Sequence, residues 1–403
     1  MRARLLPATA GPGQARALAL ATVAMVASMP GQSYLVAVFL DDWLDGAGIS
    51  RTTFSALYAA ATVASALTAL RLGRAADRLP LRRLWLLVAL GLAAACLVAS
   101  AATGIVLTLV ALSGLRALGQ GSFPLLGTLL VVRAFGRRRG AAMAAAVLGL
   151  AVGGAALPPL VSLLVDAVGW RDGYRLLAAA LVLLVVPLAL LVRDPRAPSP
   201  AGDQAGRPGG RAEAFRPGRR LPTTPVLMLL VVAATPSLVV TAVAVQAIDF
   251  LGTRGLGETA AAGALATLPA ASAVGTLLVG AIADRVDGRT LLLATTVPLA
   301  AGVAVALVPV ATAAIAGMAL MGLGMGAWFV VGGVLWARTF GLERLGRLQG
   351  LSSAAQIAGA ALGPLPLAVS LSATGSYTAG VAAMVVCAAV ALVVAAAWRH
   401  DPA

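Results

Sequence analysis

The chain has 403 residues, of which 60% are hydrophobic and 11% charged, and its mean hydropathy is +0.95. A soluble protein has roughly 45–50% apolar and about 25% charged residues, so this composition excludes a soluble globular fold and indicates a protein that lies in lipid. The apolar runs are about 20–28 residues long, whereas a strand of a membrane barrel has roughly 10 residues of alternating hydrophobicity. The sequence therefore predicts an all-α membrane protein.

The formal charge is +15, and all 30 basic residues are arginine. Such a charge on a soluble protein could indicate nucleic-acid binding, but these arginines flank apolar runs, so we expect no nucleic-acid partner. Cys96 and Cys387 lie within apolar runs, and the one histidine, His400, lies in the C-terminal tail. This pattern offers no disulfide framework and no metal site, and we expect no bound cofactor.

The first segment carries Arg2, Arg4 and Arg16 ahead of an apolar run of about 24 residues, which is longer than the roughly 7–15-residue core of a signal peptide. We expect it to form an uncleaved first membrane helix.

Twelve membrane helices are predicted along the chain, in two sets of six. Their approximate ranges are 16–40, 52–72, 84–102, 105–132, 141–165, 174–192, 223–250, 259–283, 290–311, 313–337, 347–371 and 376–398. The segment between the two sets is rich in Pro, Gly and Arg and is too polar to bury a core. We therefore predict an N-terminal six-helix bundle at 1–192, a cytoplasmic linker at 193–222 and a C-terminal six-helix bundle at 223–403.

Arginines gather on one predicted side of the membrane. That side holds the segments 73–83, 133–140, 193–222, 284–289 and 338–347, whereas the other side holds only Arg51, Arg171, Arg175 and Arg254. Segments rich in arginine remain in the cytoplasm. We therefore expect a multi-pass protein of the cell membrane, in contact with the lipid bilayer, with both termini in the cytoplasm.

The two halves of the chain are related by an internal repeat. Gly73-Arg74-Ala75-Ala76-Asp77-Arg78 returns 207 residues later as Gly280-Ala281-Ile282-Ala283-Asp284-Arg285, and more arginine follows each copy. The same offset relates Asp42 to Asp249 and Gly48 to Gly255. A repeat of this length indicates two similar bundles in one chain.

The paired hexapeptides resemble the cytoplasmic signature of the major facilitator superfamily, which lies between helices 2 and 3 and again between helices 8 and 9. The first copy matches at Gly73, Asp77, Arg78 and Arg82, with Ala75 in place of a leucine and Pro80 in place of a glycine. The second copy has Asp287 at that glycine position. The resemblance covers nearly the whole chain and implies the major facilitator fold.

Three further stretches resemble the monocarboxylate porter and oxalate/formate antiporter branch. They are Arg116-Ala117-Leu118-Gly119-Gln120-Gly121 in helix 4, the segment 133–143 leading into helix 5, and Gly169-Trp170-Arg171-Asp172-Gly173-Tyr174 at the start of helix 6. Anion carriers of this branch often place basic residues in helix 8 or helix 11. This chain departs from that pattern, because those helices carry Thr267 and Gln356 instead.

The resemblance implies a secondary transporter that works by alternating access. The expected substrate is a small organic molecule of the monocarboxylate type, moved together with protons or in exchange for a second solute, by a monomeric carrier. The alternative is an exporter of hydrophobic drugs or metabolites, driven by proton antiport, on the same fold. We expect no enzyme, because the membrane segments offer no nucleophile, metal cluster or acid–base pair.

Arg116 is the one charged residue that the predicted helices place near the midplane. It lies eleven residues after Ile105, or roughly 16 Å into the membrane at about 1.5 Å per residue. An arginine at this depth costs at least about 2.5–3.5 kcal/mol, so we expect it to face the interior. It could bind an anionic substrate through two parallel hydrogen bonds. Alternatively, it is a structural residue tied to helix 1 through Gln32 or Tyr34.

Polar and aromatic residues of other helices are further candidates for the substrate-binding site. Pro30-Gly31 should bend helix 1 and expose polar groups to a cavity, and Thr235-Pro236-Ser237 repeats this theme in helix 7. Helix–helix hydrogen bonding and packing are the competing explanations. The predicted set comprises Arg116, Gln32, Tyr34, Tyr58, Gln120, Thr241, Gln246, Trp328 and Gln356.

The resemblance assigns a cytoplasmic gate to the repeated signature, namely to Gly73, Asp77, Arg78, Gly280, Asp284 and Arg285. Helices 5 and 11 present their positive N-terminal ends to the cytoplasm. In the superfamily's pattern, Asp77 should meet the start of helix 11 and Asp284 the start of helix 5. The competing explanation is that both are solvated loop charges.

A titratable group for proton coupling is hard to identify. No Asp, Glu or His is placed in the middle of a predicted helix. Asp42, Asp249 and Asp166 lie near the outer ends of helices 1, 7 and 5. One of them could bind a proton, or all three could be solvated helix ends.

Overall fold

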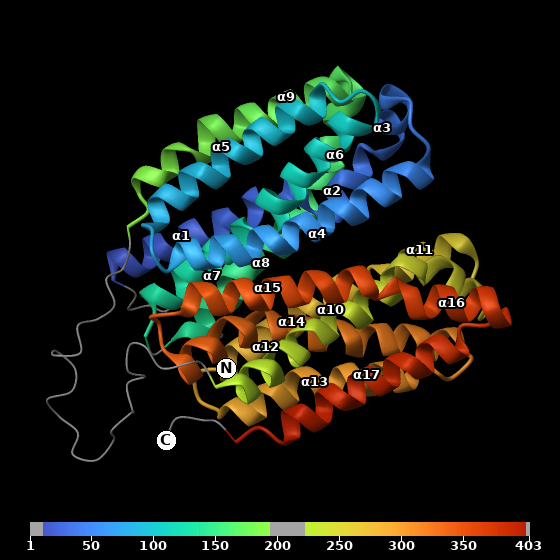
Figure 1. The fold of residues 1–403 in the computed structure, drawn as a ribbon. Helices are drawn as coiled ribbons and strands as arrows, with labels where there is room; N and C mark the ends of the chain where they lie inside the picture. The colour runs from blue at the N-terminus through green and yellow to red at the C-terminus, as the bar shows by residue number, and fades with distance from the viewer. Residues whose placement is uncertain (1–10, 137, 194–221, 400–403) are drawn as a thin grey trace, which may run out of the picture. The chain divides into compact units, whose positions relative to one another are not determined.

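The structure is a computed structural model that describes residues 11–136, 138–193 and 222–399. Within these ranges the chain is helical and contains no strand (Figure 1). This confirms the predicted all-α class, which follows from the need to pair every backbone group inside lipid.

The first half of the chain begins with a helix that is interrupted twice. Its elements are α1 (Pro12–Ala27), η1 (Met29–Gly31), α2 (Ser33–Val38), α3 (Leu40–Ala47), α4 (Arg51–Ala76), α5 (Leu81–Ser100), α6 (Gly104–Gly114), η2 (Leu115–Gln120), α7 (Phe123–Ala134), α8 (Arg139–Val168), α9 (Trp170–Ala180), η3 (Leu181–Val185) and η4 (Pro187–Leu190).

The second half has longer uninterrupted helices. Its elements are α10 (Thr223–Gly252), α11 (Glu258–Leu265), α12 (Thr267–Ile282), α13 (Gly288–Val305), α14 (Ala311–Phe340), α15 (Leu345–Leu362), α16 (Pro364–Thr374) and α17 (Thr378–Ala396).

Eleven helical segments in the described residues are long and apolar enough to cross a membrane. The predicted eighth helix, 259–283, does not appear as one continuous helix, because it is divided at Ala266 into α11 and the shorter apolar α12. Pro269 explains the break. A proline ring clashes with the carbonyl group four residues earlier, and that residue, Leu265, is the last of α11.

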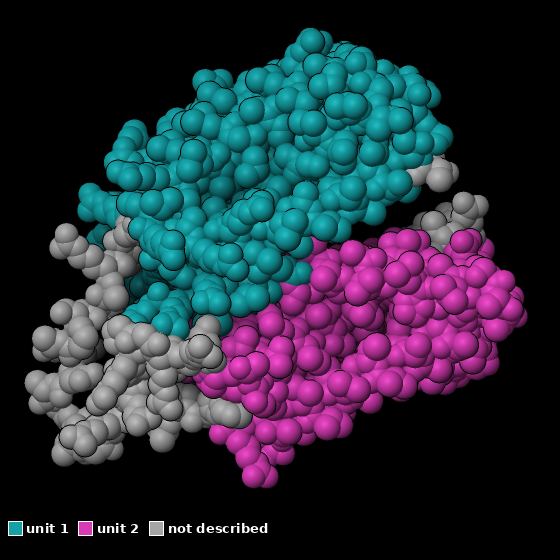
Figure 2. Space-filling model, in the orientation of Figure 1, with its two compact units in different colours: residues 1–136, 145–205, 342–354 teal, residues 137–144, 206–341, 355–403 magenta. Residues whose placement is uncertain are grey.

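The chain forms two compact units (Figure 2). Unit 1 contains residues 1–136, 145–205 and 342–354, and unit 2 contains residues 137–144, 206–341 and 355–403. Each unit therefore combines most of one half of the sequence with a short segment from the other half. The first turns of α8 belong to unit 2, and the beginning of α15 belongs to unit 1.

Both units have a buried core and an apolar exterior. In unit 2 the core is built on α10, α13, α14 and α17, with Phe250, Met318, Met321 and Met384 among its buried side chains. Other large apolar side chains point outward: Val106 is 74% exposed and Leu183 is 71% exposed. Apolar residues on the outside of a helical bundle are expected of a protein whose solvent is lipid.

Candidate functional site

Arg116 lies on η2, a turn of π-helix between α6 and α7. The N–H group of Gly121 donates to the Arg116 carbonyl group at 2.9 Å, five residues apart, and the Ser65 hydroxyl donates to the same carbonyl group at 2.9 Å. A side chain at Gly31 would clash with the backbone of η2. The glycine therefore allows helix 1 to pass directly beside the wide turn, and turns of this kind are frequent at functional sites.

The Arg116 guanidinium group is enclosed by neutral groups of unit 1. Its Nη1 atom lies 3.4 Å from the Gly31 carbonyl oxygen and 3.3 Å from Ser33 Oγ, and its Nη2 atom donates to Thr62 Oγ1 at 3.2 Å. The guanidinium carbon lies 4.4 Å from the centre of the Tyr58 ring.

These contacts leave the charge of Arg116 without an acidic partner. The residue is 3% exposed, its buried Nε–H group has no hydrogen-bond partner, and no carboxylate of the described chain forms an ion pair with it. Dipoles and an aromatic ring stabilise the cation in part. A buried cation supported only in this way can accept an anion.

The hydrogen bonds around Arg116 differ in detail from the predicted tie to helix 1. Gln32 donates instead to Ser28 Oγ at 3.1 Å, and the side chain of Tyr34 lies outside the described part of the structure. Tyr58 donates its hydroxyl hydrogen to Ser33 Oγ at 2.7 Å. Ser33 thus links Tyr58 to Arg116.

The remaining predicted residues belong to two units. Gln120 is in unit 1, on the same π-turn as Arg116, and its buried Oε1 atom has no partner in the described structure. In unit 2, Gln246 on α10 donates to the Pro364 carbonyl group at 3.0 Å. Trp328 on α14 is only 1% exposed, and Thr241 on α10 and Gln356 on α15 are half-buried.

The predicted set lacks two side chains that contact Arg116, namely Ser33 and Thr62. A signal for Thr62 was present, because it follows Tyr58 by four residues in α4 and such pairs share one face of a helix. The Thr62 hydroxyl group also donates to the Tyr58 carbonyl group at 2.8 Å, which orients its oxygen as an acceptor for the guanidinium group.

Asp77 follows α4 directly and contacts the start of α15 within unit 1. Its two carboxylate oxygens accept hydrogen bonds from the backbone N–H groups of Gly346 at 2.7 Å and Arg347 at 2.8 Å. A carboxylate at this position is stabilised by the unpaired N–H groups and the positive end of the helix. Burial nevertheless raises the pKa of Asp77, and the two backbone hydrogen bonds oppose that shift.

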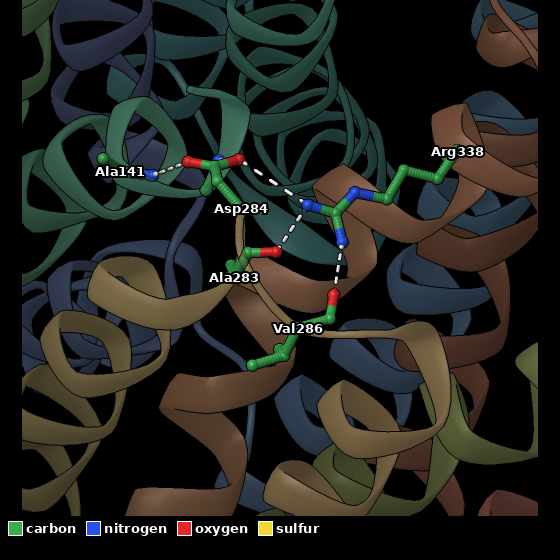
Figure 3. A network of polar contacts seen from close by, with 6 residues as sticks. Ala141, Ala283, Asp284, Val286 and Arg338 are labelled. Carbon is green, nitrogen blue, oxygen red and sulfur yellow. Dashed lines mark hydrogen bonds and ion pairs between the residues drawn. The ribbon is translucent and has the colours of Figure 1, made fainter. Parts of the chain in front are cut away.

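Asp284 makes the equivalent contact within unit 2, at the start of α8 (Figure 3). It accepts hydrogen bonds from the N–H groups of Gly140 at 2.9 Å and Ala141 at 3.3 Å. The two repeated aspartates thus bind the beginnings of two helices that are themselves related by the repeat. Arg78 and Arg285, which follow them, are exposed.

Each aspartate also has an arginine from the last turn of a helix beside it, and the sequence analysis did not assign these arginines. Arg133 of α7 lies 3.9 Å from Asp77 and donates to the Ala76 carbonyl group at 2.7 Å. Arg338 of α14 lies 3.7 Å from Asp284 and donates to the carbonyl groups of Ala283 and Val286 (Figure 3).

A signal for both arginines lies in the repeat. Arg133-Ala134-Phe135-Gly136 is similar to Arg338-Thr339-Phe340-Gly341, which lies 205 residues later, two fewer than the offset of the signature. The glycines of the signature have a related role, because a side chain at Gly73 would clash with Gly346 and a side chain at Gly280 would clash with Ala144. The aspartate of the signature therefore binds the start of a neighbouring helix, and the glycine of the signature allows that helix to approach closely.

The acidic residues considered for proton coupling lie at helix ends. Asp42, Asp166 and Asp249 are all exposed. None of the three contacts Arg116 in the described structure.

Comparison with known proteins gives a family and a fold. The family model described as the Major Facilitator Superfamily matches residues 18–268 and 240–403. No curated protein sequence matches the chain. Among solved structures, the human organic anion transporter MFSD10 (TETRAN) is similar with a TM-score of 0.72 at 15% identity, covering 96% of this chain and 100% of that chain.

Two structures of the transporter FucP are similar as well. One, in the outward conformation, has a TM-score of 0.72 at 16% identity and covers 94% of this chain and 97% of that chain. The other is a variant of the E. coli fucose:proton symporter, with a TM-score of 0.69 at 15% identity and coverages of 94% and 97%. Identities this low establish the shared fold alone.

Proposed function

The chain belongs to the Major Facilitator Superfamily and is therefore a membrane transporter, and we propose that it carries a small organic anion of the monocarboxylate type by alternating access. We place it in the cell membrane as a monomer, with both termini in the cytoplasm. The proposal rests on one observation, which is the buried guanidinium group of Arg116 with neutral partners and no carboxylate beside it among the described residues.

The distances around Arg116 support a site in which the substrate replaces protein contacts. The three hydrogen bonds to Gly31, Ser33 and Thr62 measure 3.4, 3.3 and 3.2 Å, which is long for this donor. A carboxylate would form charge-assisted hydrogen bonds of about 2.7–2.9 Å to the same nitrogens. The guanidinium group would therefore form stronger hydrogen bonds with a carboxylate than with the neutral oxygens that the carboxylate displaces.

Tyr58, Ser33 and Gln120 would complete the substrate-binding set. The Tyr58 ring lies against the guanidinium group, with the guanidinium carbon 4.4 Å from the ring centre, and Ser33 Oγ accepts a hydrogen bond from the Tyr58 hydroxyl group at 2.7 Å. The partnerless Oε1 atom of Gln120 shows that its amide is not committed to a neighbour in the described structure. In this proposal, Tyr58 and Ser33 orient the guanidinium group of Arg116, and Gln120 makes a polar contact with the substrate.

Two repeated carboxylates would form the cytoplasmic gate. Asp77 binds the start of α15 and Asp284 the start of α8. Opening toward the cytoplasm would break these hydrogen bonds, so each contact would stabilise the state that is closed on that side. Arg133 and Arg338 would hold the carboxylates of Asp77 and Asp284 in position while the gate is closed.

Exchange of one anion for another is the coupling that the charge distribution favours. The acidic residues inside the candidate membrane spans, Asp166 and Asp172, lie near the ends of α8 and α9. No carboxylate in the described spans lies beside Arg116, where it could bind a coupling proton and lose it again. An anion exchanger needs no such group, because the returning substrate carries the compensating charge.

An exporter of hydrophobic compounds is the second candidate. The near-complete burial of Arg116, at 3% exposure, favours it, because an enclosed arginine could serve structure alone and leave an apolar path for neutral molecules.

Reconstitution into proteoliposomes distinguishes these functions. We expect saturable counterflow of at least one monocarboxylate, with or without a pH gradient, and no counterflow of its neutral amide. Arg116→Gln should abolish the counterflow. If neutral hydrophobic compounds are transported, only with a pH gradient and equally well by Arg116→Gln, the anion proposal is wrong and the exporter is correct.

A further inference from the structure

A cavity of about 450 Å³ lies in unit 1, away from Arg116. Its lining comes from the first turns of α1, the end of α7 and the residues just after η4, and it includes Arg16, Ala17, Leu20, Leu130, Leu191 and Arg193. Gln14 donates to the Ala134 carbonyl group at 3.3 Å. This hydrogen bond joins α1 to α7 and forms one fixed edge of the cavity.

The cavity lies at the level where the membrane meets water. The first candidate span begins at Pro12, the fourth ends at Ala134 and the sixth ends at Leu190. Three span ends thus meet around one cavity, on the arginine-rich side that we assign to the cytoplasm. Lipid head groups occupy this level of the bilayer.

The polar part of the cavity is positively charged. Arg16 and Arg193 line it, and none of the described lining residues is acidic. Neither arginine has an ion-pair partner among the described residues. The beginning of α1 adds the partial positive charge of a helix N-terminus. This combination favours a ligand with a phosphate or another anionic group.

The other part of the cavity is apolar. Ala17, Leu20, Leu130 and Leu191 line it, and Ala17 and Leu20 are buried. A free phosphate ion would leave this wall without a partner, whereas the first carbons of an acyl chain would cover it. The lining therefore matches an amphipathic molecule with an anionic head.

We propose that this cavity binds the head group of an anionic glycerophospholipid from the cytoplasmic leaflet. Arg16 and Arg193 bind the phosphate, and the leucines contact the glycerol and the upper part of an acyl chain. Basic pockets between membrane helices on the cytoplasmic side bind anionic head groups. The site is separate from the transport site, and its existence does not depend on which solute is carried.

Native mass spectrometry and thermal unfolding of the delipidated full-length protein test this proposal. The probes are dioleoyl phosphatidylglycerol, dioleoyl phosphatidylcholine and soluble glycerol 1-phosphate. We expect phosphatidylglycerol to form a one-to-one adduct and raise the melting temperature. The double variant Arg16→Gln/Arg193→Gln should bind it on the order of tenfold more weakly or worse. Arg193→Gln alone alters only an exposed side chain and should show part of this loss.

The matched control is Arg83→Gln/Arg399→Gln, which removes two exposed arginines outside the cavity, both in segments that we assign to the cytoplasm. It should bind phosphatidylglycerol like the unmodified protein. An equal loss in this control would overturn the proposal in favour of general surface charge. Phosphatidylcholine binding as tightly would show that the charge is irrelevant, and full protection by glycerol 1-phosphate would identify a free-anion site instead of a lipid site.

Discussion

At the scale of single residues, substitutions of Arg116 can distinguish a role in substrate binding from a purely structural role. Arg116→Lys keeps the charge but loses the planar pair of donors. We expect it to weaken anion affinity by roughly ten- to a hundredfold, the equivalent of about 1.5–3 kcal/mol for one charged hydrogen bond. The measurement is substrate affinity of the purified protein, compared with its melting temperature in detergent.

The variant Arg116→Gln completes this comparison. It should abolish anion binding while the protein remains folded, since Ser33 and Thr62 can still form hydrogen bonds with a shorter polar side chain. Normal anion affinity together with a large fall in melting temperature would assign Arg116 to structure alone.

Asp77 is the second residue whose role can be measured. Asp77→Asn replaces one carboxylate oxygen with a donor, so one of the N–H groups of Gly346 and Arg347 loses its acceptor. We expect the state closed on the cytoplasmic side to weaken and transport to slow by roughly tenfold. Asp284→Asn should have a similar effect, and Asp287→Asn, at an exposed carboxylate, is the control.

The readout for Asp77 is transport rate together with labelling of a cysteine placed on the cytoplasmic side. Faster labelling in Asp77→Asn would accompany the slower transport. If both quantities match those of the unmodified protein, Asp77 is a helix-end charge without a gating role.

At the scale of elements, α14 packs closely against both α12 and α13 through its glycines. A side chain at Gly322 or Gly326 would meet the backbone of α12, and one at Gly317 or Gly324 would meet the backbone of α13. Residues four apart face the same way on a helix, as do residues seven apart. Two glycine faces therefore let three helices pack closely where no hydrophobic effect drives them together.

This packing predicts a large effect from a small substitution. A methyl group in Gly326→Ala would clash with the Ser272 carbonyl group, so we expect destabilisation of about 1–3 kcal/mol, measured as a lower melting temperature. Gly252→Ala, at the end of α10 with no atom within 4 Å of the added methyl group, should leave the melting temperature nearly unchanged. Equal effects of the two substitutions would contradict the packing argument.

At the scale of the whole molecule, orientation in the membrane can be tested by labelling. In a background with Cys387→Ser, Asp45→Cys on α3 should react with an impermeant thiol reagent in intact cells, because the segment around it has few arginines and is assigned to the outside. Ser199→Cys in the predicted linker, outside the described residues, should react only after permeabilisation. The reverse pattern would show that the assignment is wrong.

Composition and the lengths of the apolar runs were enough to predict the helical class and the order of the apolar segments, because lipid leaves a chain few ways to satisfy its backbone. The resemblance of the repeated signature to that of the superfamily implied that Asp77 and Asp284 lie beside helix starts, and the structure places both carboxylates there. Arg116 could be identified from the sequence because a charged residue near the midplane of the membrane is energetically costly.

Only the tertiary structure decided which groups surround these residues. The neighbours of Arg116 come from α4 and from the interrupted helix 1, and Thr62 Oγ1, rather than Gln32, accepts a hydrogen bond from its guanidinium group. Arg133 and Arg338 join the aspartates through the ends of α7 and α14. Ala266 divides the predicted eighth helix. Hydrophobicity determines which segments enter the membrane. Which side chains meet depends on the rotation of each helix about its axis and on close approach at glycines. Both depend on the neighbouring helices, so the sequence of a single segment does not determine them.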